Sequence, residues 1–281
     1  MSNIAIVPNQ SRDSGLIETR RLVSFLTPAH TVLLDETLCG ERIEKAEYLP
    51  REGLLKKADF IVVLGGDGTI LSIAADAAVH DVPIIGINLG TLGFLSQAER
   101  GDHSVFDDLF AGRYTIDRCM MLSISVLRDE KPIKQAIALN DAVLTGGTCT
   151  KMVNLSAAVN GTCIGSYSAD GLIVASAVGS TAYSLSAGGA VLHPELDAMI
   201  ITPICPHTLR ARSMVIPGDA CVDVRTEAPY RTQAVVTVDG RVFHTMQEQD
   251  TLRVTRSVYR TSLVRLEQRS FFDVLREKLS D

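Results

Sequence analysis

A chain of 281 residues is longer than one typical domain, so two domains are the natural expectation. Its 27 basic and 33 acidic residues leave it mildly acidic, and no long basic run is present, which argues against a nucleic-acid partner. No apolar stretch approaches the ~18 residues that span a bilayer, so no membrane partner is expected.

The N-terminus and the cysteines both favour a cytoplasmic protein. The first residues, MSNIAIVPNQ, enter a strand-like run at once, without the basic and apolar regions of a signal peptide. The six cysteines are scattered without a C-x-x-C pair, so neither a disulfide framework nor a cysteine metal site is expected. We interpret them as reduced thiols in the core.

Residues 1–117 alternate short apolar runs with helical patterns, which is typical of βα units around a parallel sheet. Strand-like runs occupy residues 3–9, 31–36, 59–66 and 83–90, and helical patterns occupy residues 16–26, 70–79 and 103–111. This alternation predicts an N-terminal α/β domain with a Rossmann-like parallel sheet.

From residue 118 the pattern changes to alternating strands separated by hairpin turns. The turns contain DEKP, Asn160-Gly161 and Asp239-Gly240, and Asn-Gly and Asp-Gly are the strongest short hairpin patterns. We therefore predict an all-β, β-sandwich-like C-terminal domain over residues 118–265. The tail, residues 266–281, again has a helical pattern and is expected to return to the first domain.

A glycine-rich turn lies between a buried strand and a helix in the stretch FIVVLGGDGTILSIA, Phe60 to Ala74. Backbone N–H groups at a helix N-terminus favour anions, so a phosphate loop is predicted at Gly65, Gly66, Gly68 and Thr69. No lysine follows as in the P-loop, and the spacing differs from the dinucleotide fingerprint. An ordinary strand-to-helix turn explains a lone GGDG equally well.

Asp67 places a carboxylate in the middle of this turn, where it would repel a bound phosphate. Two roles would explain the charge: a ligand of Mg²⁺ on the phosphates, or a base that takes a proton from an attacking hydroxyl. The second role makes the chain a candidate phosphotransferase. A second loop, INLGTLGFLSQAE, contains Asn88, Gly90 and Gly93 after the next strand, and is expected to line the same crevice.

Two segments of the β domain have the composition of a ligand site. Asn140-Asp141 lies inside a strand-like run, where polar residues are disfavoured, and its amide and carboxylate suit ribose hydroxyls or a base edge. Residues 168–194 are dense in small side chains around the sequence GSTAY, which would let the backbone approach a flat ligand. Ser180 as a helix N-cap and Tyr183 as surface packing explain GSTAY equally well.

The chain resembles the bacterial NAD kinases from Ile4 to Arg265. The resemblance rests, in chain order, on GGDGT, NLGTLGFL, the Asn-acid pair, DGLIVAS-x-x-GSTAYSLSAGG and PICPHTLRARSMV. It implies a diacylglycerol-kinase-like two-domain architecture and a homotetramer or homodimer. It also implies that NAD is converted to NADP with ATP or polyphosphate as donor, with Mg²⁺ bound to the donor phosphates. GGDGT alone is shared with diacylglycerol, sphingosine and 6-phosphofructo-kinases.

The resemblance also assigns roles to residues. It implies that Asp67 is the general base for the 2′-hydroxyl of the adenosine ribose, and that Gly68 lies near the phosphates. The NAD-binding positions that it implies, with Asp67 and Gly68, are Asn140, Asp141, Lys151, Ser168, Asp170, Thr181, Ala182, Tyr183, Ser184, Leu185, Ser186 and Arg241. No set of side chains has the spacing of metal ligands.

The chain departs from the family's usual pattern in places. The family usually has Glu where Asp141 stands, and Pro-Thr or Pro-Ser where Ala177-Val178 stands. Ser168 replaces a frequent arginine, which bears on the choice between NAD and NADH. Two alternatives remain open: a lipid or sphingosine kinase with an apolar acceptor groove, and a dinucleotide-binding sensor without catalysis. The intact Asp67 argues against the sensor.

Overall fold

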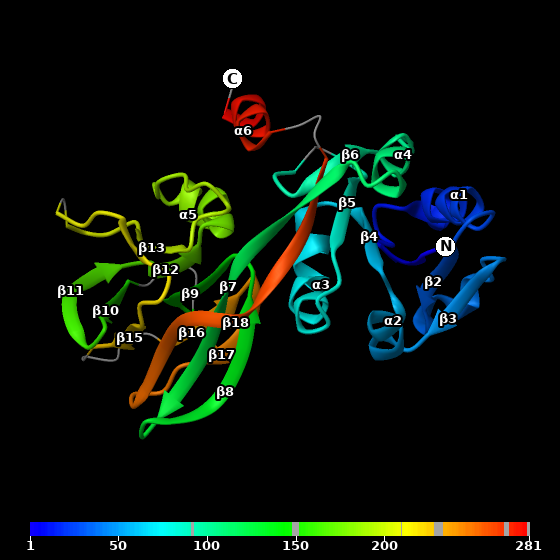
Figure 1. The fold of residues 1–281 in the computed structure, drawn as a ribbon. Coiled ribbons are helices and arrows are strands. Elements are labelled where there is room, and N and C mark those ends of the chain that lie inside the picture. The colour runs from blue at the N-terminus through cyan, green and yellow to red at the C-terminus, as the bar shows by residue number, and fades with distance from the viewer. Residues whose placement is uncertain (91–92, 148–151, 209, 228–232, 267–269, 280–281) are drawn as a thin grey trace. The chain divides into compact units, whose positions relative to one another are not determined.

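The computed structural model describes residues 1–90, 93–147, 152–208, 210–227, 233–266 and 270–279. The chain forms two compact units (Figure 1). Unit 1 comprises Met1–Arg118 and Thr261–Asp281, and unit 2 comprises Cys119–Arg260. The two-domain organisation predicted from the chain length is therefore confirmed.

Unit 1 is built on a parallel sheet. Its strands are β1 (Asn3–Pro8), β2 (Thr31–Asp35), β3 (Ala46–Leu49), β4 (Phe60–Gly65), β5 (Ile84–Asn88) and β6 (Ser96–Glu99), in the order β6-β5-β4-β1-β2-β3. The end of β18 (Asp250–Leu266) adds Leu263, which pairs with Ile84 in parallel. Central strands such as β4 are buried on both faces, which explains their Ile, Val and Leu content. The predicted α/β domain with a parallel sheet is confirmed.

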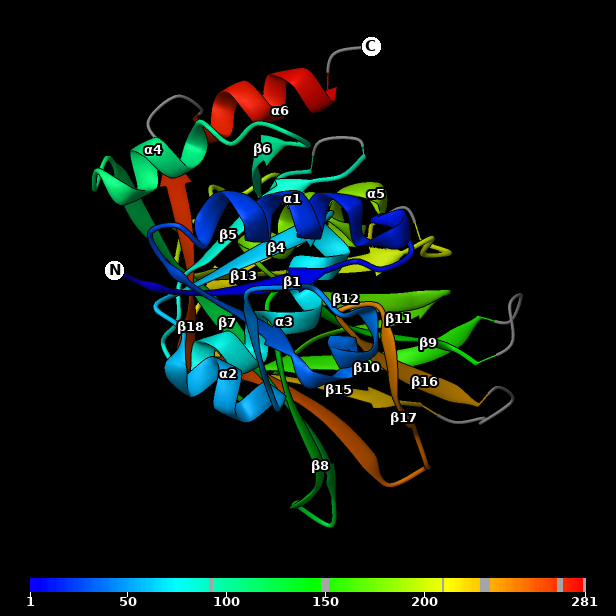
Figure 2. The same cartoon turned by 90° about the vertical axis from the view of Figure 1, so that its right-hand side faces the viewer.

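Helices cover both faces of this sheet (Figures 1 and 2). α1 (Ile17–Leu26) and α4 (Val105–Phe110) share one apolar cluster with β1, β2 and β4. α2 (Arg51–Lys57) packs on β1, β2 and β3, and α3 (Asp67–Val79) packs on β4 and β5. The connections β1-α1-β2 and β4-α3-β5 run in opposite directions along the sheet, so right-handed crossovers place α1 and α3 on opposite faces.

The direction of the strand order reverses between β1 and β4, because β1 leads to β2 on one side and β4 leads to β5 on the other. Ligands of open α/β sheets bind outside the carboxyl ends of the strands at such a reversal. The segments that leave these two strands are residues 9–13 and residues 66–68. The topology therefore singles out these segments as the place for a ligand.

Shorter elements complete unit 1: η1 (Ser14–Leu16), η2 (Glu36–Glu41) and the C-terminal helix α6 (Phe271–Leu279). The sequence pattern did not predict β3, β6 or α2, because these elements are short and have no long apolar run. Among the helices in the described part of the chain, none is both long and apolar enough to cross a membrane.

Unit 2 consists mainly of antiparallel strands, as predicted. One sheet contains, in order, β14 (Met214–Pro217), β13 (Ala198–Ile204), β12 (Gly171–Ser176), β9 (Asp141–Gly146), β16 (Ala234–Val238) and β17 (Arg241–Thr245). The remaining strands are β7 (Tyr114–Arg128), β8 (Lys131–Ala138), β10 (Val153–Val159), β11 (Thr162–Ala169), β15 (Val222–Thr226) and β18. Leu122, Leu144 and Leu155 join both groups of strands in one apolar core. Two short helices, η3 (Val178–Thr181) and α5 (Tyr183–Ser186), interrupt the β structure.

The predicted hairpin turns are present. Asn160 and Gly161 have φ angles of 51° and 78° between β10 and β11. Asp239 and Gly240 have φ angles of 46° and 75° between β16 and β17. Positive φ at both central residues gives a turn whose twist matches that of the flanking strands. In the hairpin of β7 and β8 the positive φ begins at Asp129, before the proline of DEKP.

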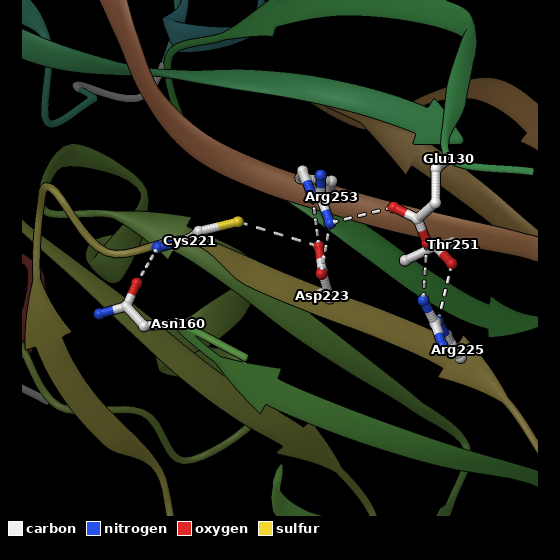
Figure 3. A network of polar contacts seen from close by, with 7 residues as sticks. All are labelled: Glu130, Asn160, Cys221, Asp223, Arg225, Thr251 and Arg253. Carbon is white, nitrogen blue, oxygen red and sulfur yellow. Dashed lines mark hydrogen bonds and ion pairs between the residues drawn. The ribbon is translucent and has the colours of Figure 1, made fainter. Parts of the chain in front are cut away.

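A network of ion pairs joins β15, β18 and the turn between β7 and β8 in unit 2 (Figure 3). Arg253 donates to both carboxylate oxygens of Asp223, at 2.7 and 2.8 Å. Glu130 lies 3.7 Å from Arg253 and 3.3 Å from Arg225, which also donates to Thr251 at 2.8 Å. The Asp223 carboxylate raises the pKa of Arg253. These charges pair with one another, so we interpret the network as structural.

The described cysteines correct one expectation. Only Cys119 among them is a buried core thiol, whereas Cys39, Cys163 and Cys205 are exposed and Cys221 is half-buried. The exposed ones lie in a 3-10 helix, on the edge strand β11 and directly after β13, where side chains reach solvent. Burial and the nearby Asp223 carboxylate raise the pKa of the Cys221 thiol.

Candidate active site

The GGDGT segment forms a strand, a turn and a helix, as its sequence predicts. β4 ends at Gly65, Gly66 is extended, and α3 begins at Asp67. A Cβ at Gly65 would lie 2.8 Å from the Cβ of Thr69, so only glycine lets the first turn of α3 pack onto the strand end. The amide of Asn9 donates to the Thr69 hydroxyl at 2.9 Å and ties the segment after β1 to this turn.

The carboxylate of Asp67 is held by the second glycine loop. The backbone N–H of Phe94 donates to Oδ2 at 2.8 Å, and that of Leu95 donates to Oδ1 at 3.2 Å. The expected proximity of the two loops is therefore present. Asn88, in contrast, hydrogen-bonds within its own loop, because its side chain bonds both backbone groups of Gly90.

A pocket of about 300 Å³ lies at the start of α3, where the strand order reverses. Its lining residues are Asn9, Arg12, Gly66, Asp67, Gly68, Thr69, Gly93 and Lys278. The guanidinium of Arg12 lies over the turn, since a Cβ at Gly66 would be 3.2 Å from its Nη1. The turn itself has no cation, as expected, but other segments of unit 1 bring two to the pocket.

Arg12 and Lys278 were not predicted as site residues from the sequence. Arg12 follows β1 and Lys278 lies on α6, both far in sequence from the glycine turn. One signal was available for Arg12: in a parallel α/β sheet the segment after β1 meets the segment after its neighbour β4. No comparable signal marks Lys278, because its place depends on how the C-terminal helix packs.

Asp141 lies in a strand, as predicted, but Asn140 does not. Leu139 and Asn140 form a bend between β8 and β9, and β9 begins at Asp141. The carboxylate of Asp239 causes the bend, because it accepts N–H bonds from Leu139, Asn140 and Asp141 at 2.9, 2.8 and 3.1 Å. Asn140 is buried at this bend. Its buried Oδ1 has no hydrogen-bond partner in the described part of the chain.

The buried carboxyl group of Asp141 interacts with that of the half-buried Asp239. Burial and, as the smaller cause, the charge of Asp239 together raise the pKa of Asp141 to about 7. Burial also raises the pKa of Asp239, but its three N–H bonds oppose that shift. We conclude that Asp239 carries the negative charge of the pair and that Asp141 holds a proton up to neutral pH.

The GSTAY block packs against this bend. A Cβ at Gly179 would lie 2.7 Å from the Cα of Asn140, so glycine is required there. The Ser180 hydroxyl is fully buried, donates to the carbonyl of Ala177 at 2.6 Å and accepts from the N–H of Leu192 at 2.9 Å. It forms no N-cap hydrogen bond, which excludes that alternative.

Side chains of the block face in different directions. Ser184 is fully buried, and its hydroxyl lies 2.8 Å from that of Thr202. Thr181, Ala182 and Leu185 are half-buried, and the Thr181 hydroxyl donates to the carbonyl of Val178 at 3.1 Å. Tyr183 and Ser186 are exposed. The block therefore has a buried anchoring side and a side open to a ligand.

The other predicted positions are also in unit 2. Asp170 is exposed in the bend between β11 and β12, and Ser168 is half-buried on β11. Arg241 is exposed at the start of β17, and Lys151 lies outside the described residues. Within the described ranges, no three His, Cys, Asp or Glu side chains form a metal site.

Three features lie together in unit 1: a glycine turn where the strand order reverses, a carboxylate on the first residue of a helix, and two cations beside that carboxylate. Together they define a phosphate-handling protein of the kinase class. Residues 4–114 match the ATP-NAD kinase N-terminal domain, and residues 139–266 match the ATP-NAD kinase C-terminal domain. The chain belongs to the ATP-NAD kinase family, and the resemblance found in the sequence is confirmed.

Relatives are similar over their whole length. The NAD kinase of Natranaerobius thermophilus is 38% identical over 283 residues, covering 100% of this chain and 98% of the relative. The NAD kinase of Heliobacterium modesticaldum is 41% identical over 281 residues, covering 99% of both chains.

Two solved structures are also similar to this chain. Yeast NADH kinase complexed with NADH has a TM-score of 0.87 at 26% identity, covering 98% of this chain and 86% of that one. An NAD kinase from Archaeoglobus fulgidus in complex with ATP has a TM-score of 0.73 at 26% identity, covering 98% of both chains.

Proposed function

We propose that this chain transfers the γ-phosphoryl group of ATP to the 2′-hydroxyl of the adenosine ribose of NAD, giving NADP. One observation carries the proposal: the Asp67 carboxylate is fixed at the head of α3, beside a pocket with two cations, in a member of the ATP-NAD kinase family. In the reaction the bond between γ-phosphorus and ADP breaks, a bond to the 2′-oxygen forms, and Asp67 takes the hydroxyl proton.

Residues of unit 1 support the donor side of this reaction. The N–H of Phe94 and the N–H of Leu95 each use one lone pair of a different Asp67 carboxylate oxygen. A lone pair therefore remains to accept a hydrogen bond from a substrate hydroxyl. In the phosphate loop, Gly65, Gly66, Gly68 and Thr69 would surround the donor phosphates at the helix N-terminus. Arg12 and Lys278 would offset the phosphate charge that the Asp67 carboxylate opposes.

A divalent cation, most simply Mg²⁺, fits the oxygen donors of this pocket. Asp67 and Thr69 offer a carboxylate and a hydroxyl there, and Mg²⁺ at nucleotide sites needs only one or two carboxylates besides phosphates and waters. When bound, the ion would neutralise charge on the donor phosphates.

Residues of unit 2 would bind NAD. The partnerless Oδ1 of Asn140 can accept a hydrogen bond, and a protonated Asp141 can donate one, which suits a ribose hydroxyl. The open side of residues 181–186 would pack on the dinucleotide, while Ser184 anchors the block from within. Lys151, Ser168, Asp170 and Arg241 are proposed as further contacts, with Ser168 bearing on the choice between NAD and NADH.

We also propose a diacylglycerol-kinase-like architecture and a cytoplasmic homotetramer or homodimer. Exposed apolar side chains on strands support an assembly, among them Val242, which is 77% exposed, and Val258, which is 91% exposed. Light scattering coupled to size-exclusion chromatography measures the oligomer size directly. A monomer at micromolar concentration would contradict this proposal.

The test of the function is one assay with several acceptors. Labelled ATP and Mg²⁺ are incubated with the chain and NAD, NADH, diacylglycerol or sphingosine, and the products are separated. We expect label in NADP, or in NADPH when NADH is used, and none in lipid. Label only in lipid would support a lipid kinase instead. Tight NADP binding without transfer to any acceptor would support a non-catalytic sensor.

A further inference from the structure

Unit 1 contains a second pocket, of about 490 Å³, at the carboxyl ends of β1 and β2 and between α2 and α3. Its apolar lining residues are Ile6, Val7, Pro8, Leu38, Leu54 and Ile73. Its other lining residues are polar: Gln10, Asp35, Glu36, Thr37, Arg51, Thr69 and Ser72. A concave pocket of this size that combines apolar walls with polar groups is typical of a small-molecule site. Apolar walls of this kind suit a flat base.

This second pocket shares Thr69 with the pocket at the glycine turn. Ser72, one helical turn later, also lines it and donates its hydroxyl to the Thr69 carbonyl at 2.7 Å. A molecule whose phosphates lie at the first turn of α3 can therefore extend past Thr69 into the second pocket. Nucleoside triphosphates have this composition, with charge at one end and a base at the other.

Two carboxylates at the end of β2, Asp35 and Glu36, line the second pocket. Oδ1 of Asp35 accepts from the N–H and the hydroxyl of Thr37, at 3.0 and 2.7 Å, and so caps η2. Glu36 has no hydrogen bond or ion pair in the described part of the chain, and it is exposed. Arg51, which also lines the pocket, donates to Asp76 at 2.7 Å and does not neutralise Glu36.

An unpaired carboxylate selects among possible occupants. It repels a phosphate chain, but it accepts hydrogen bonds from hydroxyl groups. Glu36 comes directly after the second strand of this sheet, beside a pocket that shares Thr69 with the phosphate site.

We propose that the second pocket binds the nucleoside of the phosphoryl donor, with Glu36 accepting hydrogen bonds from its ribose hydroxyls. The proposal deepens the function proposed above and rests on it. It follows that the donor is a nucleoside triphosphate, because inorganic polyphosphate would place its negative charges against Asp35 and Glu36 without gaining the ribose contacts.

The first experiment needs no variant. Initial rates with NAD are measured for ATP, 2′-deoxy-ATP, 3′-deoxy-ATP and polyphosphate as donors. We expect at least one deoxy analogue to raise the donor KM by tenfold to a hundredfold, as expected for loss of a hydrogen bond to a charged group. Polyphosphate should be a poor donor. Equal KM values for ATP and both analogues, or polyphosphate serving as well as ATP, would overturn the proposal.

The second experiment assigns the effect to Glu36. Glu36→Gln should raise the KM for ATP by tenfold or more, leave the KM for NAD unchanged, and abolish the difference between ATP and its deoxy analogues. Glu44→Gln is the matched control, because Glu44 is an exposed glutamate of the same unit that lines neither pocket. A Glu36→Gln variant with wild-type KM for ATP, or with an altered KM only for NAD, would refute the assignment.

Failure of this inference differs from failure of the proposed function. If no donor phosphorylates NAD, the function itself is wrong. If NADP forms from ATP while the analogues and Glu36→Gln behave like ATP and wild type, only the nucleoside pocket is wrong.

Discussion

Gly93 lies directly against the carboxylate of Asp67. A Cβ at Gly93 would be 2.6 Å from Oδ2 and nearer still to Oδ1, and the next residue, Phe94, donates its N–H to Oδ2 at 2.8 Å. The second glycine loop thus packs around the Asp67 carboxylate of the first loop. The contact explains how a carboxylate is tolerated in a phosphate loop, because backbone N–H groups hold it in one place.

Gly93→Ala should therefore disturb Asp67 without removing it. The added methyl group must displace the carboxylate or the loop, and a displacement of about 1 Å at a reacting group can cost ~10²-fold in rate. We expect kcat for NADP formation to fall by about that factor, with a smaller change in thermal stability. Gly53→Ala on α2 is the control, since its Cβ would meet only ordinary contacts, 3.9 Å from Pro50. Wild-type kcat for Gly93→Ala would show that this packing does not matter.

Asp67→Asn tests the base directly. The amide keeps the size of the side chain but cannot take a proton at neutral pH, so kcat should fall by about 10²–10⁴-fold, as is usual for acid–base catalysis. Circular dichroism should show an unchanged fold. Turnover within a few-fold of wild type would rule out the general-base role.

Arg12→Ala and Lys278→Ala test the cations of the phosphate pocket. Each should raise the KM for ATP by about tenfold or more, because a charge-assisted contact to phosphate is lost, and the increase should shrink at high salt. Lys56→Ala is the control, because it breaks only an exposed ion pair with Glu52 on α2. Unchanged ATP kinetics in both pocket variants would place the donor phosphates elsewhere.

The sequence predicted features that depend on neighbouring residues. The strand, turn and helix around Asp67 follow from a buried run, glycines and a helical pattern within 15 residues, Phe60 to Ala74. The hairpins at Asn160 and Asp239 follow from two residues each. These elements need no knowledge of the rest of the chain.

Features that depend on distant segments were missed or misread. Asn140 was placed in a strand, because the Asp239 carboxylate that bends the chain there is 99 residues away. Asp239 itself was predicted only as a turn residue. Arg12 and Lys278 reach the glycine turn through sheet order and helix packing, which hydrophobic periodicity does not encode.

Asp239 should act as a positioning residue for the NAD side of the site. Asp239→Ala removes the acceptor of three N–H bonds at residues 139–141, so the bend should relax and Asn140 should lose its orientation. We expect the KM for NAD to rise by about tenfold or more while the KM for ATP stays constant. Asp239→Asn keeps one acceptor oxygen and should recover part of the loss. A KM for NAD that does not respond would limit Asp239 to a purely structural role.

The raised pKa of Asp141 predicts how stability depends on pH. Its pKa is about 7 in the folded chain, against an ordinary value of 3.8, because burial disfavours the charged form. Between these values the folded state holds a proton that the unfolded state has released. The free energy of unfolding should therefore fall as pH rises from about 4 to 7, by at most ~1.4 kcal/mol per pH unit from this group.

Asp141→Asn removes this titration and should be the clearest test of the Asp141–Asp239 carboxyl pair. Because asparagine carries no charge to bury, the variant should gain stability over wild type as the pH rises from 5 to 8, and the gain should level off above pH 7. Denaturant unfolding at several pH values measures the difference, in which the other ionisable groups largely cancel. Asp219→Asn, at an exposed turn of the same unit, should show no such pH-dependent gain. If the gain of Asp141→Asn is also independent of pH, Asp141 is already ionised in the folded chain, and its contact with NAD would be that of a carboxylate, which accepts hydrogen bonds and donates none.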